Sequence, residues 1–471
     1  MNENSSSQVH LQSVEEVREQ RLSIPTKAIF GFGDWLNTIT YGMIGAFLMI
    51  FCTDTLLLPT AAVTLLLSVS KLWDAVNDPI IGAIIDKSRS KWGVYRPWLL
   101  FGSVPFAIVG ILVFAPIGGW SQTGKLVYLW ILYCTYMVVF TIYHIAYGAL
   151  GGAMTQNTDD RGSLYSYRLG TSQLLYWMLS STFLIMVSSF VARGMRQDTG
   201  YFLAAAIYIL PGIFFAALLF SKSKEVVAPP KSTKLPASQL WQFVIRNAPL
   251  LMCMAGQFVC GIYMYGRSTV MMYYFTYYAG NANLYSLYSF ISIGCGIAGP
   301  FSAQFIMAKL GNKGKCVALG TIGSGLLFAL MYFVNCGTQP VLFYILAGIS
   351  GYFNGLVMAS VYAAMLDTIE YGQYKTKVRA GAFAVSLCHF ANKLGMTIII
   401  ALIGVQLTTL GYIANQAQND AVLKCINGWF TLYPGIIGII IGLIFLFCYK
   451  LDRNTYYDIL QKLKAEQQSE Q

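Results

Sequence analysis

The stretch Lys71-Leu-Trp-Asp-Ala-Val-Asn-Asp-Pro79 places three ionisable side chains inside an apolar run that extends from about residue 61 to residue 85. A run of this length is long enough to span a bilayer as a helix. At 3.6 residues per turn, Lys71, Asp74 and Asp78 fall on one helical face. Ionised groups persist at bilayer depth only where they pair, face water or bind an ion. A Lys–Asp pair that only holds helices together would account for one carboxylate, so the second carboxylate indicates an ion or proton site.

The composition of the whole chain is that of a polytopic membrane protein. Of its 471 residues, 56% are hydrophobic and 11% are charged, whereas a soluble domain has about 25% charged residues. The ten cysteines are scattered singly, without a CxxC pair or a metal-ligand spacing. We therefore expect neither a disulfide framework nor a structural metal site.

Apolar runs long enough to span a membrane recur twelve times, which predicts an all-α membrane protein with twelve transmembrane helices. They lie at roughly 27–51, 60–85, 97–118, 126–152, 166–190, 201–221, 247–277, 283–308, 314–335, 341–365, 380–408 and 426–449.

A polar stretch between the sixth and seventh runs predicts a division of the chain into two six-helix bundles. This linker contains Pro229-Pro230, and a short interfacial helix is expected in it near residues 238–246. Two bundles of six helices are the layout of the major-facilitator fold. The predicted parts are an N-terminal tail (1–26), an N-terminal bundle (27–221), a linker (222–246), a C-terminal bundle (247–449) and a C-terminal tail (450–471).

The basic residues predict the orientation of the chain. If both termini are cytoplasmic, only Lys125, Arg193, Arg196 and Lys424 lie in outer loops, and most of the 31 lysines and arginines lie in cytoplasmic segments. This bias is the one that orients membrane proteins. It also explains the net charge of +11, so a nucleic-acid partner is not needed.

Further ionisable groups lie inside the predicted spans of the N-terminal half. Asp34 follows two glycines in Phe30-Gly-Phe-Gly-Asp34, and Thr141 and His144 share one face of the fourth span. Asp34 is either a surface carboxylate near the inner end of its helix or a group that faces a ligand. His144 is either a hydrogen-bonded packing residue or a functional residue, since histidine changes charge near neutral pH.

The C-terminal half contributes three more such groups. His389 and Lys393 are four residues apart in the eleventh span, and Arg267 lies in the seventh. Lys393 has no carboxylate in its own helix, so it requires a partner on another helix or water. Arg267 is either structural or the partner of an anionic substrate group. Because both halves supply buried charges, we expect a central site between them, where alternating-access transporters bind their ligands.

The second span and the loop after it resemble a known transporter family. The run Trp73-Asp-Ala-Val-Asn-Asp-Pro79, followed by Asp86-Lys-Ser-Arg-Ser-Lys-Trp-Gly-Val-Tyr-Arg-Pro-Trp98, is similar to the glycoside–pentoside–hexuronide:cation symporters of the major facilitator superfamily. The resemblance extends from about Phe30 to the end of the eleventh span. Its further motifs are Thr53-Asp54, Tyr147-Gly-Ala-Leu150, Asp160-Arg161 with Tyr167-Arg168, and Asp367-Thr-Ile-Glu-Tyr-Gly-Gln-Tyr-Lys375.

The resemblance implies a secondary active symporter in the cytoplasmic membrane of a bacterium. Such a protein takes up a sugar or glycoside (an oligosaccharide, pentoside or hexuronide) by alternating access, coupled to Na+, Li+ or H+, and uses no cofactor. Asp74 and Asp78 match the family's coupling-cation carboxylates, and would hold Na+ or Li+ if the ion is not a proton. Asn77 and Thr141 match neighbouring neutral cation ligands.

The resemblance also implies substrate-binding positions. Asp34 and Arg168 match positions of sugar recognition, and Lys393 matches a lysine near both sites. The chain departs from the pattern at His144-Ile-Ala-Tyr-Gly148, where the melibiose permease of this family has Asp-Ile-Pro-Tyr-Trp. A histidine there suits another sugar, a uronide carboxylate or proton coupling. The substrate-binding candidates are therefore Asp34, His144, Arg168, Lys393, His389 and Arg267.

Two other functions are compatible with parts of the sequence. The same fold also suits a carrier of lipids or other non-sugar solutes. A polytopic membrane enzyme is the alternative from another class, but the chain has no HExxH or GxSxG motif and only three histidines, so the enzyme interpretation is disfavoured. The expected partners are thus a small sugar or glycoside, the coupling cation and the lipid bilayer.

Overall fold

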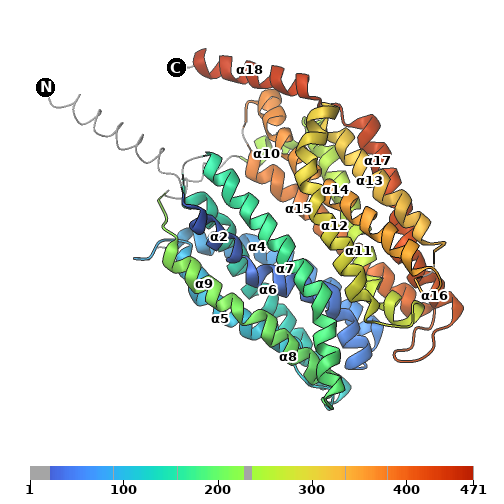
Figure 1. Ribbon diagram of the computed structural model, residues 1–471. Helices are drawn as coiled ribbons and strands as arrows, with labels where there is room; N and C mark the ends of the chain where they lie inside the picture. The colour runs from blue at the N-terminus through green and yellow to red at the C-terminus, as the bar shows by residue number, and fades with distance from the viewer. Residues whose placement is uncertain are drawn as a thin grey trace. The chain divides into compact units, whose positions relative to one another are not determined.

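The computed structural model describes residues 22–88, 90–155, 158–226, 236–334, 336–378 and 380–469, which form helices and no named strand (Figure 1). Most of the predicted N-terminal tail and residues 227–235 of the predicted linker lie outside the described part. The same holds for the side chains of Asp86, Lys87, Asp160 and Arg161. The contacts divide the chain into a first unit, Met1–Ile44 with Leu72–Ser232, and a second unit, Gly45–Lys71 with Thr233–Gln471. The division after Ser232 falls inside the predicted linker.

The first unit contains helices that are broken at two informative places. The first predicted span is interrupted at Gly33-Asp34. The sixth is interrupted before Pro211, because proline lacks the backbone N–H of a continuous helix. Its helices are α2 (Ile24–Phe32), α3 (Trp35–Met43), the part of α4 (Thr60–Lys87) that follows Lys71, α5 (Arg96–Leu112), α6 (Gln122–Ala153), α7 (Thr158–Ala192), α8 (Gln197–Ile209) and α9 (Pro211–Lys222).

The second unit is built from helices that pack in long pairs. Its elements include α10 (Ala237–Ile245), α11 (Ala248–Tyr273) with the π-helical turn η3 (Tyr274–Tyr278), α12 (Leu284–Leu310), α13 (Lys313–Met331), α14 (Pro340–Thr376), α15 (Gly381–Thr409), α16 (Asp420–Asn427), the π-helical turn η4 (Gly428–Leu432), α17 (Tyr433–Cys448) and α18 (Arg453–Ser469).

Small residues explain the close pairing of α12 with α14. A Cβ at Gly351 would lie 1.9 Å from the carbonyl oxygen of Ser292 on α12, and one at Gly355 would lie 2.0 Å from the carbonyl oxygen of Gly296. Only glycine at these positions lets the two backbones approach so closely, as is common between membrane helices.

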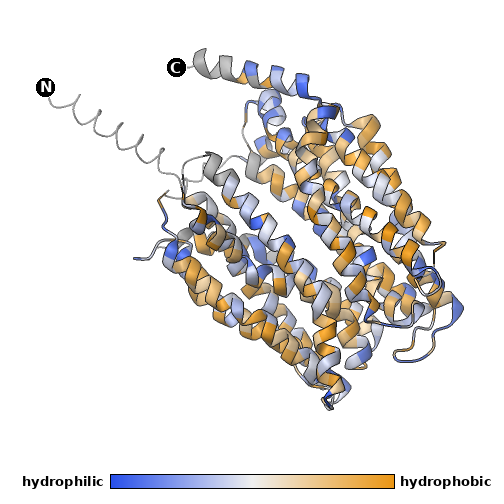
Figure 2. Cartoon of the chain, in the orientation of Figure 1, coloured by the Kyte–Doolittle hydropathy of each residue, from blue (hydrophilic) through white to orange (hydrophobic). Residues whose placement is uncertain are grey.

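The membrane character of the chain agrees with the sequence prediction. In the described residues, nine helices are long and apolar enough to cross a bilayer, and they coincide with the fourth to twelfth predicted spans. The first predicted span is divided between α2 and α3, and the second and third fall on α4, whose apolar part is Thr60–Lys71, and on the shorter α5. The count of twelve and the inward orientation of the termini therefore stay predictions. Figure 2 shows mainly hydrophobic residues along α9 and α17, and mainly hydrophilic residues along the coloured part of α18.

One segment groups differently from the predicted bundles. Residues 45–71, which we assigned to the N-terminal bundle, make their contacts with the second unit. Two π-helical turns, η1 (Ile44–Leu48) and η2 (Phe51–Thr55), lie at its start. The ring of Phe47 packs edge-on against Tyr285 of α12, with ring centroids 5.4 Å apart. The short helix predicted in the linker is present as α10, and its place at the membrane interface stays a prediction.

Candidate functional site

Two carboxylates and one hydroxyl of the first unit meet between α4 and α6. Thr141 Oγ1 lies 2.9 Å from Asp78 Oδ1 and 3.3 Å from Asp74 Oδ1. Asp74 is 2% exposed, and Asp78 is half-buried. One turn of helix separates the two aspartates, and this spacing brings both side chains to the same threonine of α6. The carboxylate pair and the threonine that we predicted as cation ligands are thus adjacent.

Asn77 completes this group with an amide. It is 5% exposed, and its Nδ2 faces the carbonyl oxygen of Met137 on α6 at 3.5 Å. All donors that this group could offer to an ion are oxygens, and hard oxygen donors suit hard cations. No group of three or more His, Cys, Asp or Glu residues that could hold a metal ion occurs among the described residues.

Asp34 is the centre of a second polar cluster in the first unit. Its carboxylate accepts hydrogen bonds from Asn37 Nδ2 and Ser172 Oγ, both at 2.8 Å. The guanidinium of Arg168 on α7 donates through Nε at 3.2 Å and through Nη2 at 3.4 Å. Arg168 also stacks over the ring of Tyr147, 4.7 Å from its centroid. Asp34 is 5% exposed, so it is a buried partner of Arg168 and not a surface carboxylate.

The break between α2 and α3 sets the position of Asp34. A break in a helix leaves backbone carbonyls without their usual partners. Two tyrosines of α6 supply these partners, since Tyr147 donates its hydroxyl to the Phe30 carbonyl at 2.6 Å and Tyr143 donates to the Gly33 carbonyl at 2.8 Å. Both tyrosines are fully buried. The hydroxyls of α6 therefore stabilise the bend that presents Asp34.

Sequence reasoning missed four residues of this cluster. Asn37 was signalled by its spacing, because it lies three residues after Asp34 on the same helical face. Ser172 was signalled in the same way, four residues after Arg168 on α7. Spacing signals neither Tyr143 nor Tyr147, because their partners are backbone carbonyls more than a hundred residues away. Tyr147 was noted only as part of the family motif Tyr147-Gly-Ala-Leu150.

The structure places His144 on α6 one turn after Thr141. Its side chain is exposed, and its ring stacks on Phe140 with centroids 5.2 Å apart and an interplanar angle of 18°. Phe140 thus covers one face of the imidazole ring. A role in binding substrate stays a prediction.

The three remaining candidates lie in the second unit. On α15, His389 is exposed and Lys393 is half-buried, and the His389 ring lies 6.0 Å from the ring of Tyr362 on α14.

Arg267 is 7% exposed, and its Nε donates to the Phe430 carbonyl at 2.9 Å. Its guanidinium lies 3.7 Å from the ring centroid of Phe328 and 4.5 Å from that of Phe430. These cation–π contacts place Arg267 within the aromatic packing of its own unit.

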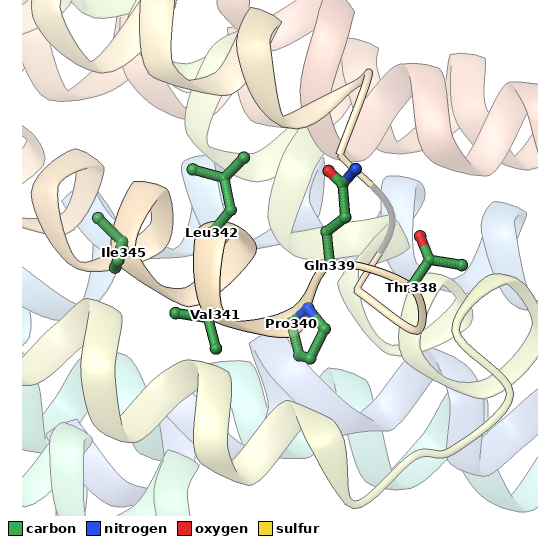
Figure 3. Close-up of a pocket in the computed structure, with 6 residues that line it drawn as sticks. All are labelled: Thr338, Gln339, Pro340, Val341, Leu342 and Ile345. Atoms are coloured by element: carbon green, nitrogen blue, oxygen red, sulfur yellow. The ribbon is translucent and has the colours of Figure 1, made fainter.

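None of these residues lines the surface hollow found in the second unit. It has a volume of about 550 Å³ and is lined by Thr338, Gln339, Pro340, Val341, Leu342 and Ile345 (Figure 3). Val341 and Ile345 are exposed apolar side chains at the start of α14. The hollow contains no charged side chain, so it adds nothing to the predicted ion or sugar site.

Comparison with known proteins identifies the family. The model of the family described as "MFS/sugar transport protein" matches residues 29–453. The chain belongs to this family. It is 30% identical to the "Uncharacterized symporter YjmB" of Bacillus subtilis, over 94% of this chain and 96% of that protein. It is 27% identical to the "Glucuronide carrier protein homolog" of Escherichia coli, over 96% of this chain and 98% of that protein.

A solved structure agrees on the fold. The crystal structure of a D-xylose-proton symporter matches with a TM-score of 0.63 at 15% identity, over 90% of this chain and 97% of that chain. The predicted major-facilitator fold is thereby confirmed. The family model and the symporter relatives confirm the resemblance to the sugar symporters. The protein is a multi-pass membrane transporter and not an enzyme, and its family and relatives support cation-coupled sugar transport.

Proposed function

We propose that the coupling cation binds at Asp74 and Asp78, with Thr141 and Asn77 as neutral ligands. The observation that carries this proposal is the contact of both carboxylates with the one hydroxyl of Thr141. Two carboxylates that share one hydroxyl repel each other, and a bound cation or proton relieves this repulsion. Na+, Li+ and H+ each satisfy this requirement.

The sugar is proposed to bind at the Asp34 cluster. Sugar hydroxyls both donate and accept hydrogen bonds, and the cluster offers both kinds of partner: the Asp34 carboxylate accepts, while Arg168 and Ser172 donate. The ring of Tyr147 is covered by Arg168, so its contribution is to hold the guanidinium and not to stack on the sugar. Because Asp34 and Arg168 neutralise each other, the cluster suits the uncharged hydroxyl face of a sugar or glycoside.

His144, His389, Lys393 and Arg267 are proposed as further substrate contacts. A histidine or lysine close to the substrate suits an acidic substituent such as a uronide carboxylate. The name of the glucuronide carrier homologue supports a test of hexuronides together with neutral glycosides. We propose that the protein couples the uptake of such a sugar to the cation by alternating access.

Coupling requires that each ligand raise the affinity of the other. By thermodynamic linkage this effect is reciprocal. In the proposed mechanism the cation offsets the charge of Asp74 and Asp78, sugar then binds, and only the empty or the fully loaded carrier changes its orientation. Either ligand alone therefore does not cross the membrane at an appreciable rate.

The experiment that tests this function is sugar uptake into proteoliposomes by the wild type and by Asp78→Asn, with and without a Na+, Li+ or H+ gradient. The variant keeps the shape of the side chain but loses its charge, so cation-stimulated accumulation should be abolished. Asp420→Asn is the matched control, since Asp420 is an exposed residue in the first turn of α16. If Asp78→Asn accumulates sugar against its gradient as well as the control does, the cation site lies elsewhere.

A further inference from the structure

Asp54 is a buried carboxylate that the transport mechanism above does not use. It lies in η2 at the end of the first predicted span and is 7% exposed. Its carboxylate accepts hydrogen bonds from the hydroxyls of Tyr277, Tyr412 (2.6 Å) and Thr53 (2.5 Å). Among the described residues, every side chain bonded to this carboxylate is thus a neutral hydroxyl.

Further bonds tie the same end of the helix to two parts of the second unit. Asn415 Nδ2 donates to the backbone carbonyl of Asp54 at 2.7 Å, and the Asn415 backbone N–H donates to the Tyr277 hydroxyl at 2.9 Å. The hydroxyls of Thr53 and Tyr273 are 2.9 Å apart. We call these six residues the Asp54 clasp: Asp54, Thr53, Tyr273, Tyr277, Tyr412 and Asn415.

The clasp is made of bonds that can open at low cost. A hydroxyl that leaves a carboxylate can exchange its partner for water, and so can the carboxylate. A salt bridge at this position would instead leave a cation without its counter-charge, which is more costly in a membrane. Neutral donors therefore suit a contact that forms and breaks in every transport cycle.

The segment that carries Asp54 begins at a change of helix geometry. The boundary between the two units falls between Ile44 and Gly45, inside the π-helical turn η1. Such turns are often found at functional sites. Among the described residues, apart from its chain neighbours and the backbone of its own helix, no atom lies within 4 Å of a Cβ built on Gly45, so this position borders open space. The chain before this point packs in the first unit and the chain after it packs in the second.

A second close contact holds the segment beyond Asp54. Thr64, in the part of α4 that belongs to the second unit, packs on Gly404 of α15, where a Cβ would lie 1.8 Å from Thr64 Oγ1. Only glycine at position 404 permits this approach. Residues 45–71 are therefore held to the second unit at both Asp54 and Thr64.

We propose that residues 45–71 form a strap, and that the Asp54 clasp is the lock that holds the outward end of the first transmembrane helix in place. The charge bias of the sequence predicts that this end faces the outside. The lock is closed in this structure and opens when the transporter admits substrate from outside, which rests on the alternating-access function proposed above. Asp54 then acts as a positioning residue and contacts neither sugar nor cation.

Cys52 is a native reporter of this lock. It precedes Thr53 in η2, is free, and is 0% exposed. A thiol must reach solvent to react, so a membrane-impermeant maleimide will label Cys52 only when the strap has left its place. The measurement uses the full-length transporter in membranes, with Cys52 as the sole cysteine after replacement of the other nine by serine or alanine.

The double variant Tyr277→Phe with Tyr412→Phe removes two donors to Asp54 without changing the size of the rings. Because each bond is made to a charged group, labelling of Cys52 should become at least about tenfold faster. Tyr278→Phe is the matched control, since its hydroxyl accepts from Asn427 Nδ2 at 3.3 Å and is not a partner of Asp54. The control should label as slowly as the wild type.

Gly404→Leu provides a second route to the same state, because it blocks the Thr64 contact and leaves the clasp residues intact. It should also accelerate labelling of Cys52. Equal labelling rates in the wild type, the double tyrosine variant and Gly404→Leu would overturn the proposal. The readout requires no sugar and no coupling ion, so it is independent of whether the uptake experiment identifies a substrate.

Discussion

Thr141 has one hydroxyl proton and lies within hydrogen-bond distance of two carboxylates, Asp74 and Asp78. It can donate to only one carboxylate at a time, so the other relies on different partners or on a bound cation. The hydroxyl oxygen keeps lone pairs that a cation can use. Thr141 can therefore donate its proton to one carboxylate and at the same time bind the ion through a lone pair of the same hydroxyl.

Replacement of Thr141 tests this role. Thr141→Ala should raise the cation concentration required for half-maximal uptake by about tenfold, because one ligand and one charged hydrogen bond are lost. Thr141→Ser keeps the hydroxyl and should restore the wild-type cation dependence. The measurement is uptake against cation concentration at saturating sugar. An alanine variant with unchanged cation dependence would remove Thr141 from the proposed ion site.

At this scale the sequence singled out the charged residues of both clusters, with Thr141 and Asn77, and missed most of the neutral partners of Asp34. Charges inside an apolar span are costly, so Asp34, Asp74 and Asp78 stood out without any structure. Ser172 was signalled only by its spacing from Arg168, because hydroxyl residues are common in membrane helices and often bond to their own backbone, as Ser180 does with the Tyr176 carbonyl at 2.7 Å.

The elements are held in place by groups that come from distant parts of the chain. The clearest case is Glu225, which follows α9 and reaches the start of α5. Its carboxylate accepts from the backbone N–H groups of Val94, Tyr95 and Arg96 at 2.7, 2.8 and 2.9 Å. These are amides without a partner inside the helix, and an anion at a helix N-terminus is also favoured by the helix dipole.

Loss of this cap should lower stability without changing the site. Glu225→Ala should destabilise the first unit by about 1–3 kcal/mol, since three partly buried amides lose a charged acceptor. Glu225→Gln keeps one acceptor oxygen and should cost less than the alanine variant. Thermal unfolding of the purified transporter measures the effect, and the sugar and cation dependence of uptake should stay unchanged. A variant as stable as the wild type would show that water replaces the carboxylate.

The helices themselves followed from hydropathy, whereas their interruptions and their grouping did not. A long apolar run predicts a span because backbone groups in lipid must bond within the helix. The π-helical turns η1 and η2 and the attachment of residues 45–71 to the second unit depend on contacts with residues far along the chain, such as Tyr285 and Gly404. The break at Gly33-Asp34 was signalled only by its two glycines.

For the whole molecule, the central claim is that an ion at the α4–α6 carboxylates and a sugar at the Asp34 cluster assist each other. The two clusters share α6, which carries Thr141 of the first and Tyr143 and Tyr147 of the second. Because all three residues lie on one helix, a movement of Thr141 that accompanies ion binding would also move Tyr143 and Tyr147. These tyrosines hold the bend that positions Asp34. This arrangement lies wholly within the first unit.

The most direct test is thermal unfolding of the purified transporter with a panel of neutral glycosides and hexuronides, each with Na+, with Li+ or with neither, across a range of pH. A ligand that binds only the folded state raises the free energy of unfolding by RT ln(1 + L/Kd), where L is the free ligand concentration. We predict that one sugar and one cation together raise the unfolding temperature by more than the sum of their separate shifts, and that Asp78→Asn removes this excess. Shifts that are merely additive for every pair, or an excess that survives in Asp78→Asn, would contradict the account.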